Sequence, residues 1–253
     1  MDTKFWGPSG WKLLHTIAFS ELKDKATIKE FFELIPFVLP CKFCRASLTE
    51  YMEKDPVDVS SGNALARWLW RIHNNVNDKL RGQGLLKTKN PSFDTVANMY
   101  STPPEVFEGW DFLFSIAENH PYSKFTKSLP MEGCPSKESL LCEKDKNRWN
   151  TMTPDERFNK YVDFWKILGK VLPHPWREMW NSCELNSKTL DKRVTWVKEL
   201  WRIRCCMEKP AECYQEMCKR VARHRSGCGK KRRARTCRRV RGSKNTSNSK
   251  SKK

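Results

Sequence analysis

The sequence predicts an all-α protein: a compact bundle of four helices, a second, mostly helical region, and a basic tail. Apolar residues recur at spacings of three and four along most of the 253 residues, which is the period of amphipathic helices. No segment shows the alternation of a strand. The formal net charge of +19 is uneven, because 16 Lys and Arg and no acidic residue lie between Lys219 and Lys253. The chain up to Cys218 carries 32 basic and 29 acidic side chains and is nearly neutral.

Two helices are expected between the start of the chain and Pro40. Pro8 suits a first helical position, and the apolar face that follows it consists of Trp11, Leu14, His15, Ala18 and Leu22. Thr27 is the expected cap of a second helix, whose apolar face is Ile28, Phe31, Phe32 and Ile35. Pro36 and Pro40 disturb this second helix and position the segment after it.

Two more helices complete the predicted bundle. Residues 41–44 open a third helix, which continues through the apolar residues Leu48, Tyr51 and Met52. Ser60 or Ser61 caps a fourth helix, and Gly82 and Gly84 end it. Its apolar stripe consists of Leu65, Trp68, Leu69, Ile72, Val76 and Leu80. Four helices with short links are typical of a bundle.

Composition divides the rest of the chain. Residues 85–142 are rich in Pro, Ser, Thr and Asn, with short helices expected over residues 94–100 and 105–118. A second helical region spans about residues 153–223 and contains no motif that indicates a function. We therefore predict a first domain over residues 1–120, a helical accessory domain over residues 121–226 and a disordered basic tail over residues 227–253.

Composition also limits the class of protein. No stretch approaches the roughly 20 apolar residues of a membrane span, and the first residues lack the apolar run of a secretion signal. A cytoplasmic protein that does not enter a membrane is therefore expected. Eleven cysteines are many for such a protein, because cytosolic cysteines usually serve metal binding or redox chemistry.

Cys41 and Cys44 form a CxxC pair, a spacing that lets the two sulfur atoms reach bonding distance within one helical turn. At the start of a helix, the free N–H groups stabilise a thiolate. A bare CxxC can also be half of a zinc site or a structural bridge. Residues 1–130 contain no second close Cys or His pair, so zinc is disfavoured here but stays open.

Polar side chains interrupt two of the apolar helices. In the fourth helix His73 and Asn77 lie one turn apart, and in the first helix Trp11 and His15 share a face. Taken alone, each pattern is more typical of a satisfied core histidine or an amphipathic core helix than of a cofactor site. Their combination with the CxxC, in this order, carries the functional prediction.

These three segments resemble the Erv/ALR family of flavin sulfhydryl oxidases. The matching patterns are W-G-P-x-x-W-x-x-L-H-x-x-A, P-C-x-x-C-R-x-x-L and W-L-x-x-I-H-N-x-V-N-x-K-L, and the match covers about residues 1–85. The resemblance implies a helical bundle with a short fifth helix that binds FAD, and a homodimer that pairs through its first helices. It also implies protein dithiols as substrates and molecular oxygen as the electron acceptor, with hydrogen peroxide as the product.

The resemblance further implies roles for individual residues. Cys44 would lie beside the reactive edge of the flavin, and Cys41 would face incoming thiols. A substrate thiolate would attack their disulfide, a second thiol would resolve the mixed disulfide, and Cys44 would pass two electrons to the flavin. The residues around the flavin would be Trp6, Gly7, Trp11, His15, His73, Asn74, Val76, Asn77 and Lys79.

The chain departs from the family pattern at two places. Many cellular members have Arg where this chain has Pro8, and the Trp-Gly-Pro version is more similar to members from large DNA viruses. Cellular members also carry a structural cysteine pair after the Lys-Leu segment, whereas residues 90–110 contain no cysteine. That bridge is therefore not expected here.

Family members often use an extra cysteine pair to carry electrons from the substrate to the CxxC. The candidates are Cys134/Cys142, Cys205 or Cys206 with a partner, Cys213/Cys218 and Cys228/Cys237. Cys228/Cys237 is favoured as the shuttle because its Gly- and Arg-rich surroundings would keep it exposed and activate the thiols. For any one pair, the alternative is that its cysteines form a structural bridge or stay as free thiols.

The tail from Lys219 has the charge to bind nucleic acid or another polyanion without sequence specificity. A solvated, disordered end and a nuclear-targeting segment are the alternatives.

Two other interpretations of the whole chain compete with a flavin enzyme. A thioredoxin-like protein would need strands around the CxxC, and a basic zinc protein would leave the Trp, His and Asn patterns unexplained. An irregular zinc set for the latter would be Cys213, Cys218, His224 and Cys228.

Overall fold

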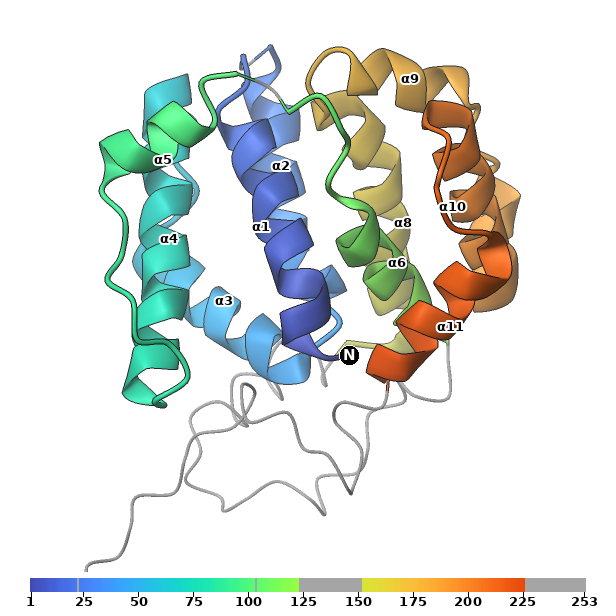
Figure 1. The fold of residues 1–253 in the computed structure, drawn as a ribbon, viewed down its shortest axis with the longest axis horizontal. Helices are drawn as coiled ribbons and strands as arrows, with labels where there is room; N and C mark the ends of the chain where they lie inside the picture. The colour runs from blue at the N-terminus through green and yellow to red at the C-terminus, as the bar shows by residue number, and fades with distance from the viewer. Residues whose placement is uncertain (22, 103, 123–151, 226–253) are drawn as a thin grey trace, which may run out of the picture.

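The computed structural model describes residues 1–21, 23–102, 104–122 and 152–225, and these residues form helices without any strand (Figure 1). The all-α prediction is confirmed for them, whereas the predicted disorder of the tail lies outside the described residues. The first part contains α1 (Thr3–Ala18), α2 (Lys25–Val38), α3 (Lys42–Lys54), α4 (Gly62–Gly82), α5 (Phe93–Met99) and α6 (Trp110–Glu118). The second part contains α8 (Pro154–Val171), α9 (Trp176–Ser182), the 3-10 helix η3 (Ser187–Asp191), α10 (Arg193–Met207) and α11 (Tyr214–Arg225).

Two predicted helix starts in the bundle are wrong, and in both an aspartate is the true cap; the helix expected from residue 105 also begins later, at Trp110. Asp2 caps α1 by accepting a hydrogen bond from the N–H of Lys4 at 3.1 Å, so Pro8 lies inside the helix. The helix accommodates Pro8 with the loss of one backbone hydrogen bond, because the face of α1 opposite Pro8 is packed in the core. Asp24 caps α2 by accepting from the N–H of Thr27 at 3.1 Å, and the Thr27 hydroxyl donates to the same carboxylate.

The ends of the other bundle helices agree with the sequence. Ser61 caps α4 by accepting from the N–H of Ala64 at 3.0 Å, and the helix ends at Gly82. Gly84 has a φ of +70°, a left-handed conformation that favours glycine. None of the described helices is both long enough and apolar enough to cross a membrane.

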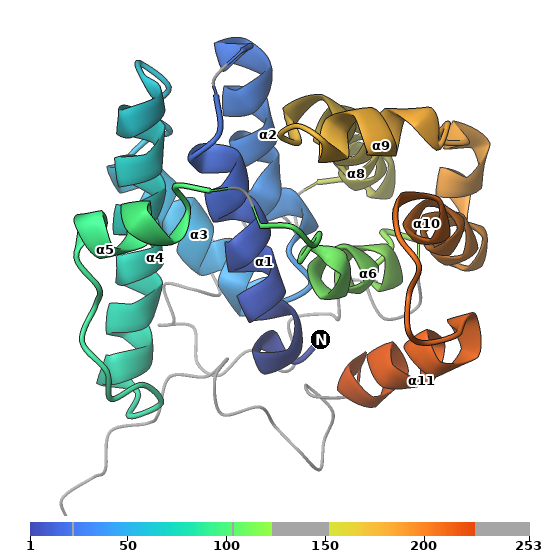
Figure 2. The same ribbon diagram turned by 45° about the horizontal axis from the view of Figure 1, so that its top comes forward.

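One apolar core runs through both parts of the chain. α2 packs along α8, where Phe31 and Phe164 stack with ring centroids 5.7 Å apart and both side chains are fully buried. α6 packs against α1 on one side and against α10 on the other (Figure 2). Trp165 of α8 and Trp196 of α10 extend the core with centroids 4.7 Å apart. The boundary at residue 120 stays a prediction, and α2, α6 and α8 pack across it.

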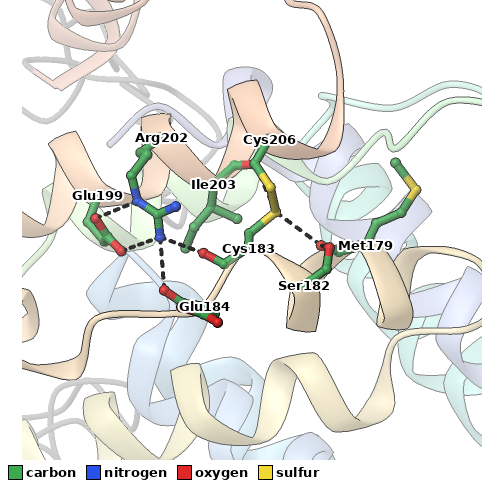
Figure 3. The surroundings of a disulfide bond; sticks show 8 residues. All are labelled: Met179, Ser182, Cys183, Glu184, Glu199, Arg202, Ile203 and Cys206. Carbon is green, nitrogen blue, oxygen red and sulfur yellow. Dashed lines mark hydrogen bonds and ion pairs between the residues drawn. A yellow bond between two sulfur atoms is a disulfide. The ribbon is translucent and has the colours of Figure 1, made fainter.

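A disulfide joins α9 to α10 (Figure 3). It links Cys183, directly after α9, to Cys206 in the last turn of α10, with Cα atoms 5.9 Å apart. Arg202 holds the same turn by donating to the carbonyls of Cys183 at 2.6 Å and Glu184 at 2.9 Å. Its guanidinium also pairs with Glu199 at 2.7 Å. The turn after α9 is thus attached to α10 both covalently and by hydrogen bonds.

α11 docks against the first residues of the chain, and Figure 1 shows it at the same end of the molecule as the N-terminus. The N–H of Asp2 donates to the carbonyl of His224 at 3.0 Å. The imidazole of His224 stacks on Phe5 with centroids 4.3 Å apart. The guanidinium of Arg220 also lies over Phe5, 5.4 Å from its centroid. The first helix and the last described helix therefore share one surface.

Ion pairs fix α11 to α6. Glu118, whose side chain is only 5% exposed, pairs with Arg193 of α10 at 3.0 Å and with Arg225 of α11. Arg220 of α11 pairs with Asp111 of α6. Breaking a buried pair leaves an uncompensated charge, so these contacts resist separation of α11 from the rest of the molecule.

Candidate functional site

The CxxC lies at the start of α3. Cys41 is the N-cap residue and has an extended backbone, with φ −134° and ψ 118°. Its carbonyl accepts hydrogen bonds from the N–H groups of Cys44 and Arg45, both at 3.0 Å. Cys44 therefore lies in the first turn of α3, where the partial positive charge of the helix N-terminus favours a thiolate. Cys41 is only 3% exposed and Cys44 is half-buried.

Arg45 stabilises the backbone that leads into the CxxC. Its side chain is 9% exposed, and its guanidinium donates to the carbonyl of Leu39 at 2.9 Å. Leu39 is the residue after α2, so this bond holds the Leu39–Pro40 link against α3. The backbone nitrogen of Met1 donates to the carbonyl of Pro40 at 3.4 Å. The residues before Cys41 are thus held by both α3 and the start of the chain.

The predicted cofactor residues of α1 and α4 meet in one aromatic cluster. His15 Nε2 and His73 Nδ1 are 3.0 Å apart and share a hydrogen bond. The indole of Trp11 stacks on the His73 imidazole with centroids 3.9 Å apart and an angle of 8° between the planes. Trp11, His15 and His73, which the family resemblance assigns to the flavin surroundings, thus lie together in the structure.

Burial keeps both imidazoles neutral. Burial, and secondarily the charge of His73, lowers the pKa of His15 to about 3. Burial lowers the pKa of His73 to about 4. Their shared hydrogen bond accounts for one nitrogen of each ring, whereas the buried Nδ1 of His15 has no hydrogen-bond partner among the described residues. A buried polar atom of this kind is suited to hydrogen-bond a bound molecule.

Side-chain contacts join the dithiol helix to α4. Lys79 donates to the hydroxyl of Ser47 on α3 at 2.7 Å. The hydroxyl of Tyr51, also on α3, donates to the carbonyl of Asn75 at 3.4 Å. Burial raises the pKa of Tyr51, and the nearby charges of Glu50 and Cys44 raise it further. The CxxC and the predicted cofactor residues of α4 are therefore on two helices in direct contact.

The remaining predicted residues differ in how close they lie to the cluster. Asn74, Val76 and Asn77 are half-buried on the same turns of α4 as His73 and Lys79. Trp6 faces elsewhere, because it packs on Phe112 of α6 with centroids 5.8 Å apart. A Cβ built on Gly7 would meet nothing within 4 Å, so that position is open. The structure brings neither Trp6 nor Gly7 to the histidine pair.

Sequence reasoning missed Tyr100 as a site residue. Its ring stacks on His15 with centroids 5.2 Å apart and on Phe19 at 5.5 Å. Phe19 and Tyr100 also border a cavity of about 390 Å³ between the ends of α1 and α8 and the start of α2. Tyr100 directly follows α5 in a Ser-, Thr- and Asn-rich segment, so no local pattern in the sequence pointed to it.

The other cysteines are distributed over the second part of the chain. Cys206 pairs with Cys183, a partner that the sequence did not suggest, while Cys205 and Cys213 are exposed free thiols. The favoured shuttle pair, Cys228 and Cys237, and the candidate pair Cys134/Cys142 lie outside the described residues. Of the irregular zinc set, His224 stacks on Phe5 instead of facing a cysteine. Within the described ranges, no group of three or more His, Cys, Asp or Glu side chains is arranged to hold a metal ion.

The cluster fits a flavin on chemical grounds. Trp11, His73 and Tyr100 provide flat ring surfaces, and the buried Nδ1 of His15 provides a polar partner. Lys79 and Asn77 add a cation and an amide within the next two turns after His73, which suits a group that carries phosphates and polar ring edges. The residues that could hold FAD are therefore concentrated on α1 and α4.

The chain is similar to known proteins over this part of the molecule. Residues 8–95 match the model of the Erv1 / Alr family. The chain is 30% identical over 115 residues to the mitochondrial FAD-linked sulfhydryl oxidase ERV1 of Saccharomyces cerevisiae, covering 44% of this chain and 54% of that protein. It is 33% identical over 81 residues to the FAD-linked sulfhydryl oxidase of African swine fever virus, covering 30% and 67%. The FAD-linked sulfhydryl oxidase ERV1 of Oryza sativa subsp. japonica is 34% identical over 80 residues, covering 29% and 41%.

The chain thus spans about half the length of the yeast relative and two thirds of the viral one. No solved structure matches the chain significantly. The match to the family model ends at residue 95, so α6 and the helices from α8 to α11 lie beyond it.

Proposed function

This chain belongs to the Erv1/Alr family, and on that premise we propose that it is an FAD-linked sulfhydryl oxidase that forms disulfide bonds in proteins. The observation that carries the proposal is the contact between α3, which begins with the CxxC, and α4, which carries His73. Two hydrogen bonds join these helices, from Lys79 to Ser47 and from Tyr51 to the carbonyl of Asn75. Such a contact allows electrons to pass from the dithiol to a cofactor held on α4.

The residues of the cluster would bind and orient the cofactor. Trp11, His15, His73, Asn74, Val76, Asn77 and Lys79 are the proposed cofactor-binding residues, and Tyr100 joins them through its stacking on His15. Trp6 and Gly7 belong to the proposal only through the family pattern. When bound, FAD supplies a two-electron acceptor that molecular oxygen reoxidises, giving hydrogen peroxide.

The cysteines would carry out the exchange with the substrate. A substrate thiolate attacks the Cys41 sulfur, the Cys41–Cys44 bond breaks, and Cys44 leaves as a thiolate that the start of α3 stabilises. A second thiolate of the substrate attacks the sulfur bonded to Cys41, which forms the substrate disulfide and releases the Cys41 thiolate. Because Cys41 is only 3% exposed, a substrate thiolate can reach its sulfur only after a local opening of the residues before α3.

Cys228 and Cys237 are the proposed shuttle pair. The last described residue, Arg225, follows His224, whose carbonyl bonds to Asp2. Asp2 adjoins Met1, which contacts Pro40, the neighbour of Cys41. Cys228 follows Arg225 by three residues in the sequence. The attachment of α11 to the residues before the dithiol supports a shuttle pair that follows α11 in the chain.

Three further expectations are part of the proposal. The family resemblance supports a homodimer that pairs through its first helices. The sequence supports a cytoplasmic location and phosphate binding by the tail. Each awaits its own measurement: the molar mass in solution, fractionation of the producing cells, and binding of mixed-sequence DNA at several salt concentrations.

The direct test is the visible spectrum of the purified protein, followed by addition of dithiothreitol in air. We expect a flavin spectrum that bleaches when the thiol is added and recovers after the thiol is consumed, with hydrogen peroxide accumulating in step with oxygen uptake. A folded protein that stays colourless and acquires no spectrum after incubation with FAD would overturn the proposal. Zinc content would then be measured, because a basic zinc protein is the remaining interpretation.

A further inference from the structure

We infer that α6, α8, α9 and α10 form a second copy of the first helical bundle, which binds no flavin and takes the place of a partner subunit on α1 and α2. Only the number of flavins rests on the proposed function, whereas the pairing of the two copies rests on sequence and contacts. The inference replaces the homodimer that the family resemblance implies with a pair inside one chain. Three features carry it: a repeated sequence, symmetric contacts and a filled cofactor position.

Two helices of the first bundle recur in sequence later in the chain. G-W-K-L-L-H-T-I-A, residues 10–18 of α1, corresponds to G-W-D-F-L-F-S-I-A, residues 109–117 at α6. F-F-E-L-I-P-F-V-L-P, residues 31–40 at the end of α2, corresponds to F-W-K-I-L-G-K-V-L-P, residues 164–173 at the end of α8. The residues that are identical in each pair are buried in both copies, apart from the half-buried Trp11. Each helix therefore uses the same apolar face twice.

The other helices follow in the same order. L-W-R-I stands at residues 69–72 of α4 and again at residues 200–203 of α10, and α9 follows the repeated V-L-P as α3 does. In Figure 1, α3 and α4 lie on one side of the molecule and α9 and α10 on the other, with α1, α2, α6 and α8 between them. A half turn in the plane of that view exchanges the two sets, since α3 lies at the lower left and α9 at the upper right. Chain order and position in space therefore both relate one copy to the other.

The contacts between α1 and α6 are symmetric, as they are in a two-fold dimer, where residue i meets residue j and j meets i. A Cβ built on Gly10 of α1 would lie 3.0 Å from the ring of Phe112. Gly109 is the counterpart of Gly10, and a Cβ built there would lie 3.1 Å from the side chain of Leu13. Leu13 is in turn the counterpart of Phe112. The two glycines let the paired helices approach closely, and each faces the same position of the other copy.

Some residues contact their own counterparts. The hydroxyl of Ser9 donates to the carbonyl of Glu108, its counterpart, at 2.6 Å. Phe31 stacks on Phe164, its counterpart, with ring centroids 5.7 Å apart. Only residues near a two-fold axis can touch their counterparts, so one axis relates α1 to α6 and α2 to α8. The faces of α1 and α2 that a second chain would need for pairing are thus covered by α6 and α8 of the same chain.

The second copy keeps the geometry of the aromatic cluster without its polar atoms. Trp11 and His15 have ring centroids 6.0 Å apart and an angle of 37° between their planes. Their counterparts Trp110 and Phe114 have centroids 6.0 Å apart and an angle of 36°. The phenyl ring of Phe114 has no nitrogen to hydrogen-bond a cofactor, unlike the imidazole of His15.

Arg204 fills the position that corresponds to His73. Its side chain is only 13% exposed, and its guanidinium lies 5.8 Å from the ring centroid of Trp110. The same guanidinium pairs with Glu208 at 2.8 Å and with Glu212 at 2.9 Å. A paired guanidinium therefore occupies the place beside Trp110 where a flat cofactor ring would have to lie.

The dithiol is also missing from the second copy. His174 stands at the position of Cys41, and Arg177 stands at the position of Cys44. The second copy thus lacks both the dithiol and the polar groups of the cofactor cluster. What it retains is the apolar face that pairs with α1 and α2.

Carbodiimide cross-linking of the full-length protein tests whether the pairing lies within one chain. The reagent joins an amine to a carboxylate in an ion pair, and Lys12 of α1 pairs with Glu108, directly before α6, across the proposed axis. We expect mass spectrometry to find the Lys12–Glu108 link in the single-chain band of a denaturing gel, and Glu108→Gln should abolish it. The Lys54–Glu50 pair within α3 is the control, since its link should form in both proteins. A Lys12–Glu108 link confined to the two-chain band overturns the inference, as does its absence from a sample in which the control link has formed.

Light scattering and flavin absorbance complete the test. We expect the molar mass of one chain, 29.8 kDa, and one flavin per chain. Specific oxygen uptake should stay constant within about twofold over a roughly thousandfold dilution, because a single chain has no subunit to lose. A molar mass of two chains overturns the replacement of a partner subunit, and two flavins per chain overturn the inference that the second copy binds none. A colourless protein would contradict the proposed function instead, and the cross-link and the molar mass would still decide the pairing.

Discussion

The two helical parts of the chain use their polar side chains in opposite ways. In α1, α3 and α4, buried or half-buried polar groups face one another without full pairing, as His15 and His73 do. Around α8, α10 and α11 the buried charged groups are paired instead, as Glu199 is with Arg202, and as Glu118 of α6 is with Arg193 and Arg225. Polar groups without a full set of partners in a core lower stability but can bind a ligand. The first part is therefore suited to binding a cofactor, and the second part to stabilising the fold.

Two helices of the second part, α8 and α9, also approach each other very closely. A Cβ placed on Gly169 of α8 would lie 2.5 Å from the indole of Trp180, so α8 and α9 approach more closely than any other residue would allow. The disulfide between Cys183 and Cys206 adds a covalent link to this region. The comparison predicts that changes in the first part alter activity, and that changes in the second part alter stability.

The largest effect is expected from Cys44→Ser. Oxygen uptake with dithiothreitol should fall at least about a thousandfold, because the variant lacks the Cys44 thiolate that passes electrons to the flavin. The flavin spectrum and the free energy of unfolding should stay close to those of the unchanged protein. Cys205→Ser is the matched control, since Cys205 is an exposed free thiol, and it should keep its activity within about twofold. Residual turnover by Cys44→Ser above a tenth would contradict the assignment.

Phe164→Ala tests whether the two parts are separate. Phe164 is fully buried against Phe31 of α2, so its loss should lower the free energy of unfolding by about 3–5 kcal/mol. If the parts share one core, tryptophan fluorescence and circular dichroism in urea will show a single transition that shifts as a whole. Two transitions, only one of which shifts, would support the boundary at residue 120. Val194→Ala, at a half-exposed valine, should change stability by less than about 0.5 kcal/mol.

Removal of the disulfide should destabilise the second part. Cys183 and Cys206 are 23 residues apart, and a loop of that length constrains the unfolded chain by about 3 kcal/mol. Cys206→Ser should lower the thermal midpoint accordingly, while the flavin spectrum is retained. The neighbouring change Cys205→Ser removes no bond and should leave the midpoint unchanged. Equal midpoints for the two variants would show that the bond contributes nothing to stability.

The smallest effect for a single residue is the response of each histidine to acid, and it comes from the first part. His15 and His73 have pKa values of about 3 and about 4 in the folded protein, below the ordinary value of 6.5 in the unfolded chain. The unfolded chain therefore binds protons first. The histidines give their full stabilisation above pH 6.5, and it is lost progressively as the pH falls toward 4. At pH 5 the loss is roughly 2 kcal/mol for each histidine.

Urea titrations between pH 7.5 and pH 4.5 measure this dependence. His73→Gln removes one of the two groups and should reduce the slope of stability against pH. An unchanged slope in His73→Gln would show that its imidazole is not held neutral by burial.

The sequence predicted the first part well because its constraints are local. Ser61 and Gly82 mark the ends of α4 by their own backbone preferences, and the CxxC opens α3 at the expected residue. The starts of α1 and α2 were missed because the competing caps, Asp2 and Asp24, lie upstream of the predicted starts at Pro8 and Thr27. Aspartate accepts an N–H more strongly than a threonine hydroxyl, and it therefore decides the boundary.

The contacts that could not be predicted join residues far apart in the chain. Nothing near Tyr100 indicates that its ring would stack on His15, and nothing near Cys183 selects Cys206 from the other cysteines. Both pairings follow from how whole helices pack. The packing of α2 against α8 and of α6 between α1 and α10 is likewise a property of the assembled core.

The docking of α11 on α1 has a consequence for synthesis. Phe5 emerges from the ribosome long before its ring partner His224, which lies 219 residues later in α11. At roughly 5–20 residues per second, translation takes about 11–44 s to deliver that partner. During this interval the nascent chain exposes Phe5 and the face of α1 that α6 and α11 later cover. Chaperones would therefore encounter α1 before α11 exists.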